Sequence, residues 1–322
     1  MRLVTVSALT ALAALAATAP PAAATLAFQR AATGEIVVAN DDGSSPRVIA
    51  RGQFPVVSPD GRRVAFLAAT SGVRGRIRVI GVHGGRPWTA VRRGVVVRAR
   101  AAIWSPGGRR LVAAADRGAD GYVVSALTRR RRPIRFAGDF SGATFSPDGR
   151  TLVVQRLSIS FMRADLVAID LRGHRRRTVR GRSLPVWGAG GVAWRNADAT
   201  YKDPGTFAAI AVSRTLTGPA REVLRGGPAL DAPVAWSADG SRLLVADGQS
   251  GQMQALILKP STGASQTLPA AFASSTDAPA IAALSRDGQL VLGEAGGDVI
   301  TEDLSGAITV LAAGATTPTW SR

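Results

Sequence analysis

The chain has 322 residues, of which 46% are hydrophobic, and it contains no cysteine. The absence of cysteine excludes disulfides, thiolate metal sites and thiol nucleophiles together. Its 40 basic and 22 acidic residues give a formal net charge of +18 at pH 7, which bears on solubility and on anionic partners rather than on the fold.

Residues 1–24 have the composition of an export signal. Arg2 gives a positive start, an apolar Ala- and Leu-rich stretch covers 3–19, and small residues end the segment at Ala24. We expect cleavage after Ala24 and a mature chain of residues 25–322 outside the cytoplasm, in the periplasm, in the cell wall or secreted. An uncleaved membrane anchor is the alternative, although the stretch is short and weakly apolar for a span.

The first strands are predicted directly after this segment, at 26–28, 35–39 and 47–50. A Ser-Pro-Asp-Gly turn, or a variant of it, then recurs along the rest of the chain at intervals of 36 to 49 residues. Proline presets the first corner of a type I turn, and glycine accepts the left-handed position. The copies, named by their serine or its equivalent, are Ser58, Ser105, Ser146, Arg195, Ser237, Ser285 and Ser321.

Three short runs follow each full turn, and each run is predicted to be a strand. The first runs are 63–68, 110–115, 151–155, 242–246 and 289–293. The second runs are 77–82, 122–127, 166–171, 207–212, 253–258 and 298–304. The third, more polar runs are 86–91, 133–136, 177–179, 221–224, 266–268 and 308–311. With the strand that leads into the turn, each unit has the four strands of a propeller blade.

The two ends of the chain complement each other. Residues 25–51 lack an opening strand, and residues 318–321 are an opening strand with nothing after it. We therefore expect a single all-β propeller of about seven four-stranded blades, closed by the N-terminal strands pairing with the C-terminal strand. Six blades is the alternative, because unit 190–226 has lost the Asp-Gly turn and is irregular around Tyr201.

An aromatic residue often precedes the turn. Four tryptophans occupy that position, where a large flat side chain would pack between adjacent blades. They are Trp104, Trp194, Trp236 and Trp320.

The turn followed by an aliphatic strand resembles the TolB-like β-propeller repeat family, over essentially all of the mature chain. The resemblance implies the propeller fold. It implies little about activity, because that family mixes protein-binding scaffolds, peptidase-associated propellers and uncharacterised proteins. No functional residue carries over, since the matching residues belong to turns and to the core.

The sequence offers no catalytic constellation. His83 and His174 are the two histidines, and both lie in Gly- and Arg-rich turns without a nearby carboxylate cluster. No serine has the Gly-x-Ser-x-Gly context of a nucleophile elbow, and phosphate-loop and zinc motifs are missing. Asp41-Asp42-Gly43 is interpreted as a hairpin turn, because further spaced oxygen ligands for calcium are lacking. We assign no catalytic residue, no metal site and no cofactor.

The positive charge is concentrated in residues 51–200. The turn between the last two strands of a unit is rich in arginine in the second to fourth units, acidic in the first at Asp41 and Asp42, and preceded by Glu302 and Asp303 in the last. These arginines predict a basic rim that binds phosphates or carboxylates by charge-assisted contacts. The predicted rim consists of Arg86, Arg129, Arg130, Arg131, Arg132, Arg172, Arg175, Arg176 and Arg177.

We therefore predict a secreted, monomeric, non-enzymatic binding scaffold at the cell envelope. Its partner would be anionic: a cell-wall polymer, lipid head groups or an acidic protein. Nucleic acid is disfavoured by export and by the lack of aromatic residues among the basic turns. Two alternatives stay open. The arginines could form a solvated surface without a specific partner, or the central channel mouth could serve a small-ligand receptor or a hydrolase- or lyase-type enzyme.

Overall fold

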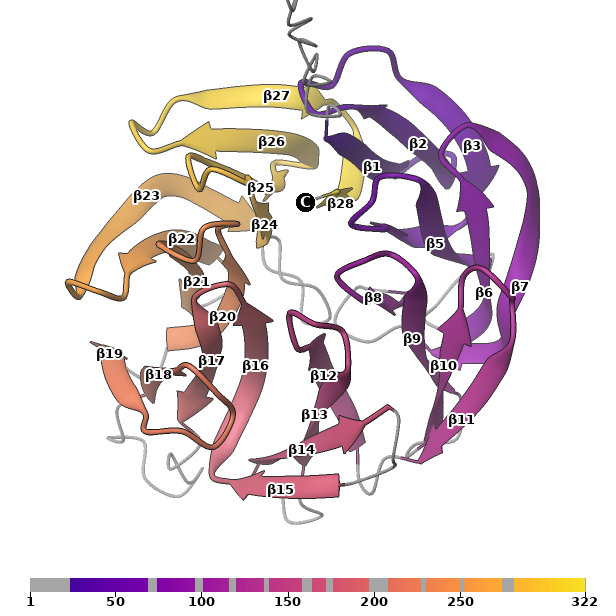
Figure 1. Cartoon of the computed structure of the whole chain (residues 1–322). Coiled ribbons are helices and arrows are strands. Elements are labelled where there is room, and N and C mark those ends of the chain that lie inside the picture. The colour runs from indigo at the N-terminus through magenta and orange to yellow at the C-terminus, as the bar shows by residue number, and fades with distance from the viewer. Residues whose placement is uncertain are drawn as a thin grey trace, which may run out of the picture.

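The structure is a computed structural model that describes residues 24–68, 74–95, 101–115, 120–135, 139–157, 164–171, 176–196, 208–226, 230–249, 252–273 and 281–321. Regular structure in these residues consists of β-strands without any helix. The strands are arranged in sheets around one axis (Figure 1). The predicted all-β propeller class is therefore confirmed.

The described strands form antiparallel sheets, five of them with four strands and one with eight. The first sheet holds, in spatial order, β28 (Ala315–Trp320), β1 (Thr25–Arg30), β2 (Glu35–Asn40) and β3 (Arg47–Arg51). The eight-stranded sheet joins two successive units. Its first unit is β4 (Gln53–Val57), β5 (Arg63–Ala68), β6 (Arg74–Gly81) and β7 (Gly84–Val95). Its second is β8 (Ile103–Trp104), β9 (Arg110–Ala115), β10 (Asp120–Ser125) and β11 (Arg131–Arg135).

The other four sheets repeat the same order of strands. One holds β12 (Asp139–Phe145), β13 (Thr151–Leu157), β14 (Ala164–Asp170) and β15 (Arg176–Arg180). The next holds β16 (Arg182–Gly188), β17 (Gly191–Asn196), β18 (Ala208–Ser213) and β19 (Arg221–Gly226), and the third holds β20 (Leu230–Trp236), β21 (Leu243–Gln249), β22 (Gln252–Lys259) and β23 (Ala264–Ala273). The last holds β24 (Ile281–Leu284), β25 (Leu290–Ala295), β26 (Asp298–Asp303) and β27 (Ile308–Ala312). The irregular unit of residues 190–226 thus contributes to a four-stranded sheet, and its doubtful residues around Tyr201 lie outside the described residues.

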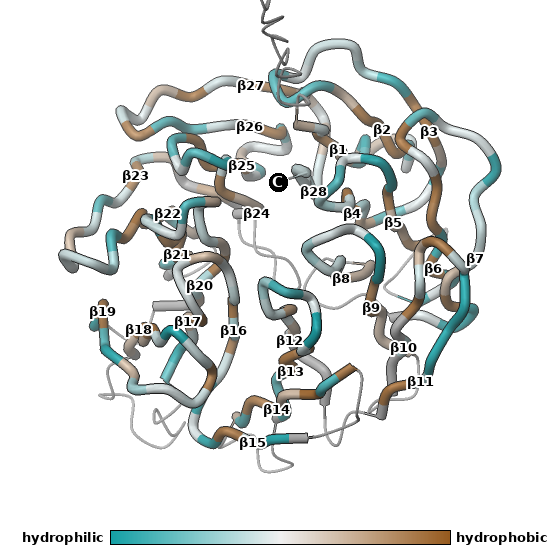
Figure 2. The backbone as a smooth tube through the Cα atoms, viewed as in Figure 1, coloured by the Kyte–Doolittle hydropathy of each residue, from teal (hydrophilic) through white to brown (hydrophobic). Residues whose placement is uncertain are grey.

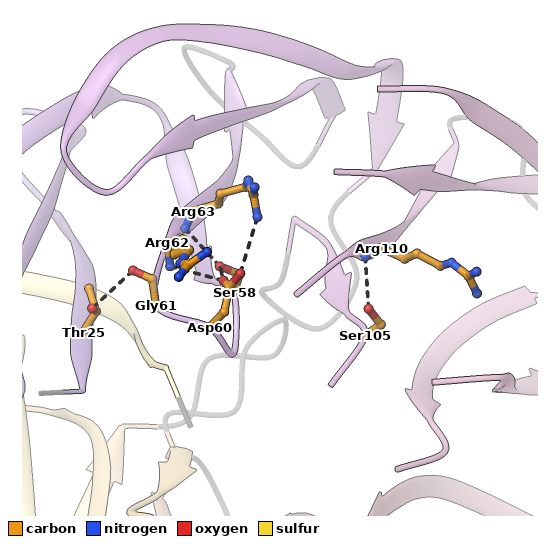
Figure 3. Close-up of polar contacts among 8 residues, drawn as sticks. All are labelled: Thr25, Ser58, Asp60, Gly61, Arg62, Arg63, Ser105 and Arg110. Carbon is orange, nitrogen blue, oxygen red and sulfur yellow. Dashed lines mark hydrogen bonds and ion pairs between the residues drawn. The ribbon is translucent and has the colours of Figure 1, made fainter. Parts of the chain in front are cut away.

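A buried serine organises the turn between the first two strands of a unit. The Ser58 N–H donates to Arg63 O at 2.8 Å, and the Arg63 N–H donates to Ser58 Oγ at 3.0 Å. The Ser58 hydroxyl in turn donates to Asp60 Oδ1 at 2.5 Å (Figure 3). The same three contacts recur at Ser146 and Ser237. Proline and glycine shape this turn, but the serine hydroxyl connects its two ends.

The two ends of the chain share one such turn. The Ser321 N–H donates to Thr25 O at 2.9 Å, and the Thr25 N–H donates to Ser321 Oγ at 2.7 Å. Thr25 thereby takes the place that Arg63 has in the turn of Ser58. The pairing continues along the strands, with Leu26 of β1 opposite Trp320 of β28.

The core lies between neighbouring sheets, where hydrophobic residues run along the strands (Figure 2). The four tryptophans before the turns are at most 9% exposed, and each packs against the sheet that precedes it. Trp104 also donates its indole N–H to Val56 O of the preceding unit at 3.0 Å. Burying an aromatic side chain of this size stabilises the fold by roughly 4 kcal/mol. The predicted packing between blades is confirmed.

The inner turns also contact one another around the axis. Gly108 has φ +63, and a Cβ added to it would lie 2.7 Å from Cγ of Asp60 in the neighbouring turn. Its neighbour Gly107 lacks a positive φ, and a Cβ there would meet nothing within 4 Å. Two adjacent glycines in one turn are therefore under different constraints.

We expect Gly108→Ala to destabilise the protein by about 2 kcal/mol or more, because a left-handed alanine is strained and its methyl group clashes with Asp60. Gly107→Ala is the matched control and should change the free energy of unfolding by less than about 0.5 kcal/mol. Denaturant unfolding of both variants measures the difference. Equal stability of the two variants would contradict this account.

The turn carboxylates predict a loss of stability in acid. The Ser237 hydroxyl and then the Ser241 N–H lower the pKa of Asp239 from 3.8 to about 2, and hydroxyl contacts also lower the pKa values of Asp148 and Asp287. Because the unfolded state binds protons first, the stabilisation is present above pH 3.8 and is lost as the pH falls towards 2. The stability difference between the wild type and Asp239→Asn, measured by denaturant midpoints, should shrink over this window. A difference that is independent of pH would contradict it.

Candidate anion-binding surface

Two sets of turns lie on the same face of the ring. In an antiparallel sheet, the turn after the first strand and the turn after the third strand emerge at the same edge. Backbone hydrogen bonds link the two turns, since the Val82 N–H donates to Arg62 O at 3.0 Å and the Ala126 N–H donates to Arg109 O at 2.9 Å. We call this side the turn face. The inner turns surround the axis, and the outer turns form the rim (Figure 1).

The structure places the predicted rim on this face, but mostly in strands. Arg129 and Arg130 lie in the β10–β11 turn, whereas Arg131 and Arg132 open β11. Arg86 lies near the start of β7, and Arg176 and Arg177 open β15. Arg86 and Arg177 lie in third strands, as the runs 86–91 and 177–179 predicted. The expectation that Arg131, Arg132 and Arg176 lie in turns before those strands was wrong, because the outer strands begin earlier than their hydrophobic pattern indicates. Arg172 and Arg175 lie outside the described residues.

A second arc of arginines lies inside the rim, directly after the inner turns. Arg62 and Arg63 follow Gly61 of the β4–β5 turn. Figure 3 shows both arginines beside Ser58. The arc consists of Arg62, Arg63, Arg109, Arg110 and Arg150. Sequence reasoning missed it, although the repeated Gly-Arg after the turn was visible. The position of Arg62 holds Ser241 in the turn before β21 and Gln289 in the turn before β25, so arginine at this position is confined to one sector. The position of Arg63 also holds an arginine outside this sector, Arg242.

The balance of charge differs between the units of this sector. Arg63 lies 3.5 Å from Asp60, and Arg150 lies 3.8 Å from Asp148, in both cases within one turn. The β8–β9 turn carries Gly107 in place of the aspartate. Within the described part of the chain, no carboxylate lies in ion-pair range of the exposed arginines of this unit. These arginines are Arg109, Arg110, Arg129, Arg130 and Arg131. Among the turns of this sector on the turn face, positive charge is therefore least compensated on β8–β11.

Some rim arginines connect neighbouring units. The Arg47 Nη2 donates to Val82 O at 2.6 Å, and the Arg132 Nη1 donates to Leu171 O at 3.0 Å. The Arg129 guanidinium lies 5.7 Å from the ring centroid of Trp88 in the preceding unit, a cation–π distance. Arg129 and Arg132 thus have structural partners, in contrast to Arg130 and Arg131.

The acidic residues expected near the turn of the last unit have different roles. Glu302 is fully buried, and its Oε1 accepts from the Ala270 N–H of β23 at 2.9 Å. Burial raises the pKa of Glu302. Asp303 caps its own turn through the Ser305 N–H at 2.7 Å, and the Ser305 hydroxyl lowers its pKa. Only Asp303 therefore contributes negative charge to the surface there.

The residues considered for metal or catalytic roles form no such site where the structure describes them. Asp42 accepts from the Ser44 N–H at 2.8 Å, as a hairpin aspartate does. His83 Nδ1 lies 3.4 Å from Arg47 Nη2, and His174 lies outside the described residues. Among those described, no three His, Asp or Glu side chains are grouped as a metal site requires.

Polar side chains near the axis hold backbone bulges. Phe54, Leu184 and Thr317 each precede a proline in an innermost strand and have φ between 51 and 55. Their N–H groups donate to side-chain oxygens of the preceding second strand, such as Gln155 Oε1 at 2.7 Å from Leu184 N. The half-buried Glu294 serves Thr317 in the same way at 3.3 Å, and desolvation raises its pKa. The carboxylate with a perturbed pKa at the axis is thus engaged in positioning the backbone.

No helix in the described residues is long and apolar enough to cross a membrane.

No family model and no curated protein matches the chain. Its fold is similar to TolB from Acinetobacter baumannii, with 15% identity, TM-score 0.57 and coverage of 91% of this chain and 81% of that chain. It is also similar to an oligogalacturonate lyase in complex with manganese, with 15% identity, TM-score 0.59 and coverage of 89% and 83%. The tricorn protease aligns with 94% of this chain but 36% of its own, at 11% identity and TM-score 0.63. At these identities the likeness concerns the fold, and it confirms the resemblance to TolB-like propellers.

Proposed function

We propose that this protein is exported and acts outside the cytoplasm as a non-enzymatic binding scaffold, whose basic surface contacts an anionic component of the cell envelope. The export signal of residues 1–24 and the propeller fold support this proposal. The cluster of uncompensated arginines on β8–β11 carries it. We call Arg109, Arg110, Arg130 and Arg131 the basic cluster.

Physical reasoning connects this cluster to an anionic partner. The sheet and its turns fix the backbone positions from which these arginine side chains extend, and guanidinium groups contact carboxylates or phosphates in bidentate fashion. Mutual repulsion among the arginines of one unit is relieved when a polyanion approaches. Because the groups are exposed, the attraction is screened beyond about 10 Å in ordinary salt. Binding should therefore be strong at low ionic strength and should weaken steeply as salt is added.

The test is co-sedimentation of the mature protein with purified cell envelope and with anionic lipid vesicles, across a salt series. Changing all four arginines of the basic cluster to serine should weaken binding by nearly a thousandfold, at about 1 kcal/mol for each charge near an anionic surface. Arg129 and Arg132 are left unchanged because of their structural contacts.

A matched control removes four arginines outside the basic cluster: Arg30, Arg51, Arg221 and Arg225. It lowers the net charge equally and should retain most of the binding. Binding that ignores both salt and the basic-cluster variant would overturn the proposal. Equal loss in both variants would indicate a response to net charge alone, and would also overturn it.

A further inference from the structure

The β8–β9 turn differs from the other complete inner turns at one chemically decisive position. In the turns of Asp60, Asp148, Asp239 and Asp287, the carboxylate Oδ1 accepts from the serine hydroxyl at 2.5 to 2.6 Å. The same oxygen accepts from the backbone N–H two residues further on, at 3.0 to 3.2 Å. One carboxylate oxygen thus receives two hydrogen bonds inside each of these turns.

The β8–β9 turn keeps the donors but lacks the acceptor. Its backbone is closed in the same way, with the Ser105 N–H donating to Arg110 O at 2.8 Å and the Arg110 N–H donating to Ser105 Oγ at 3.0 Å. Residue 107 is glycine, so the turn has no carboxylate. Among the described residues, neither the Ser105 hydroxyl hydrogen nor the Arg109 N–H has an acceptor. Ser105 is only 5% exposed, so its hydroxyl hydrogen is a buried donor without an acceptor in the described part of the chain.

The place of the missing carboxylate is open. A Cβ added to Gly107 would meet no heavy atom within 4 Å, and Gly107 itself is exposed. A small group from solvent can therefore approach the two donors from the turn face.

The surrounding charges favour an anion at this point. Arg109 and Arg110 belong to the turn, and the exposed Arg130 lies in the outer turn of the same unit. Turns that carry a carboxylate flank the β8–β9 turn on both sides. Asp60 faces Gly108 from the preceding turn. Its Oδ1 is bonded within its own turn, and Arg63 lies 3.5 Å from its Oδ2. In the following turn, Asp148 precedes Gly149, which lies against Ser105 and Pro106, and Arg150 lies 3.8 Å from Asp148. Each flanking carboxylate is therefore compensated by an arginine of its own turn, whereas the arginines of the β8–β9 turn are not.

We infer that the β8–β9 turn is an oxyanion-binding site, where one oxygen of a carboxylate or phosphate group takes the position filled elsewhere by the turn's own aspartate. That oxygen accepts from the Ser105 hydroxyl and from the Arg109 N–H, while the other oxygens face the arginines. The inference rests on the proposed function, for which it supplies the specific anchor within the basic surface. It explains how a general electrostatic attraction acquires a fixed point of attachment.

The test follows the Arg109 backbone amide by NMR while the mature protein is titrated with inorganic phosphate and, separately, with acetate. The Arg109 signal should move and saturate, because an N–H that gains a charged acceptor changes its environment. Comparison of the two probes shows whether the site prefers phosphate or carboxylate. A shift that rises linearly without saturation for both probes would overturn the inference.

Gly107→Asp is the decisive variant, since it restores the internal acceptor that the sister turns already have. It should fold normally and weaken phosphate and acetate binding at least about tenfold, the loss expected for hydrogen bonds to a charged group. Gly107→Asn is a second variant that fills the same position without charge and should also block the site. Gly107→Ala should bind as the wild type does.

Thr128→Asp controls for charge alone, because it adds one carboxylate to the outer turn of the same unit without reaching the two donors. It should weaken binding far less than Gly107→Asp does. Equal weakening by the two variants, or wild-type binding by Gly107→Asp, would overturn the inference. Saturable binding at Arg109 without envelope co-sedimentation would keep this site and reject the proposed function. The converse result would keep the basic surface and reject this anchor.

Discussion

The buried serine hydroxyl of the inner turn is the interaction on which the rest of this structure depends. A hydroxyl can accept and donate at once, so Ser58 Oγ accepts from the Arg63 N–H and donates its own O–H to Asp60 Oδ1. Each such hydrogen bond contributes only about 1 kcal/mol net, but leaving a buried hydroxyl unpaired costs about 1–3 kcal/mol. The repeat therefore retains serine wherever a complete turn is built. At Ser321 the partner comes from Thr25, so the same contact joins the two ends of the chain.

This turn also determines where functional side chains appear. Because every complete copy has the same backbone geometry, the residues directly after the turn emerge at equivalent places on the turn face. Arginines at that position in three successive units produce an arc, and Ser241 and Gln289 interrupt it further along. Repeat proteins can change surface chemistry in this way without disturbing the scaffold. Gly107 is a second example. This one residue removes the carboxylate from the turn, while the hydrogen bonds between Ser105 and Arg110 still close it.

The arginines of the surface fall into two groups with different energetic roles. Arg47 and Arg132 donate to backbone carbonyls of the next unit, and Arg129 lies over Trp88. These contacts tie outer strands together at the rim, where the sheets diverge and hydrophobic packing is weakest. Arg109, Arg110, Arg130 and Arg131 lack such partners among the described residues. The net charge therefore counts arginines that are engaged in structural contacts as well as those available to bind a partner. The contacts of each arginine distinguish the two groups.

Features that depend on local chemistry could be predicted from the sequence. The turn residues, the strand runs and the tryptophan before the turn all act within a few residues or within one repeat, so their spacing predicted strands, sheets and the propeller class. The boundaries of the outer strands were less certain, because arginines such as Arg131 and Arg176 pair as strand residues even though they are not hydrophobic.

Contacts between residues of separate repeats could be identified only in the folded protein. Asp60 faces Gly108, Arg132 reaches Leu171, and Glu302 is buried against β23. The pattern of one repeat does not encode these contacts, since they depend on how far one sheet is rotated and splayed from the next. Recognising the unpaired donors at Ser105 and Arg109 required both the sequence pattern and the folded structure. The sequence shows glycine where an aspartate recurs, and the structure shows that the place of its carboxylate is accessible.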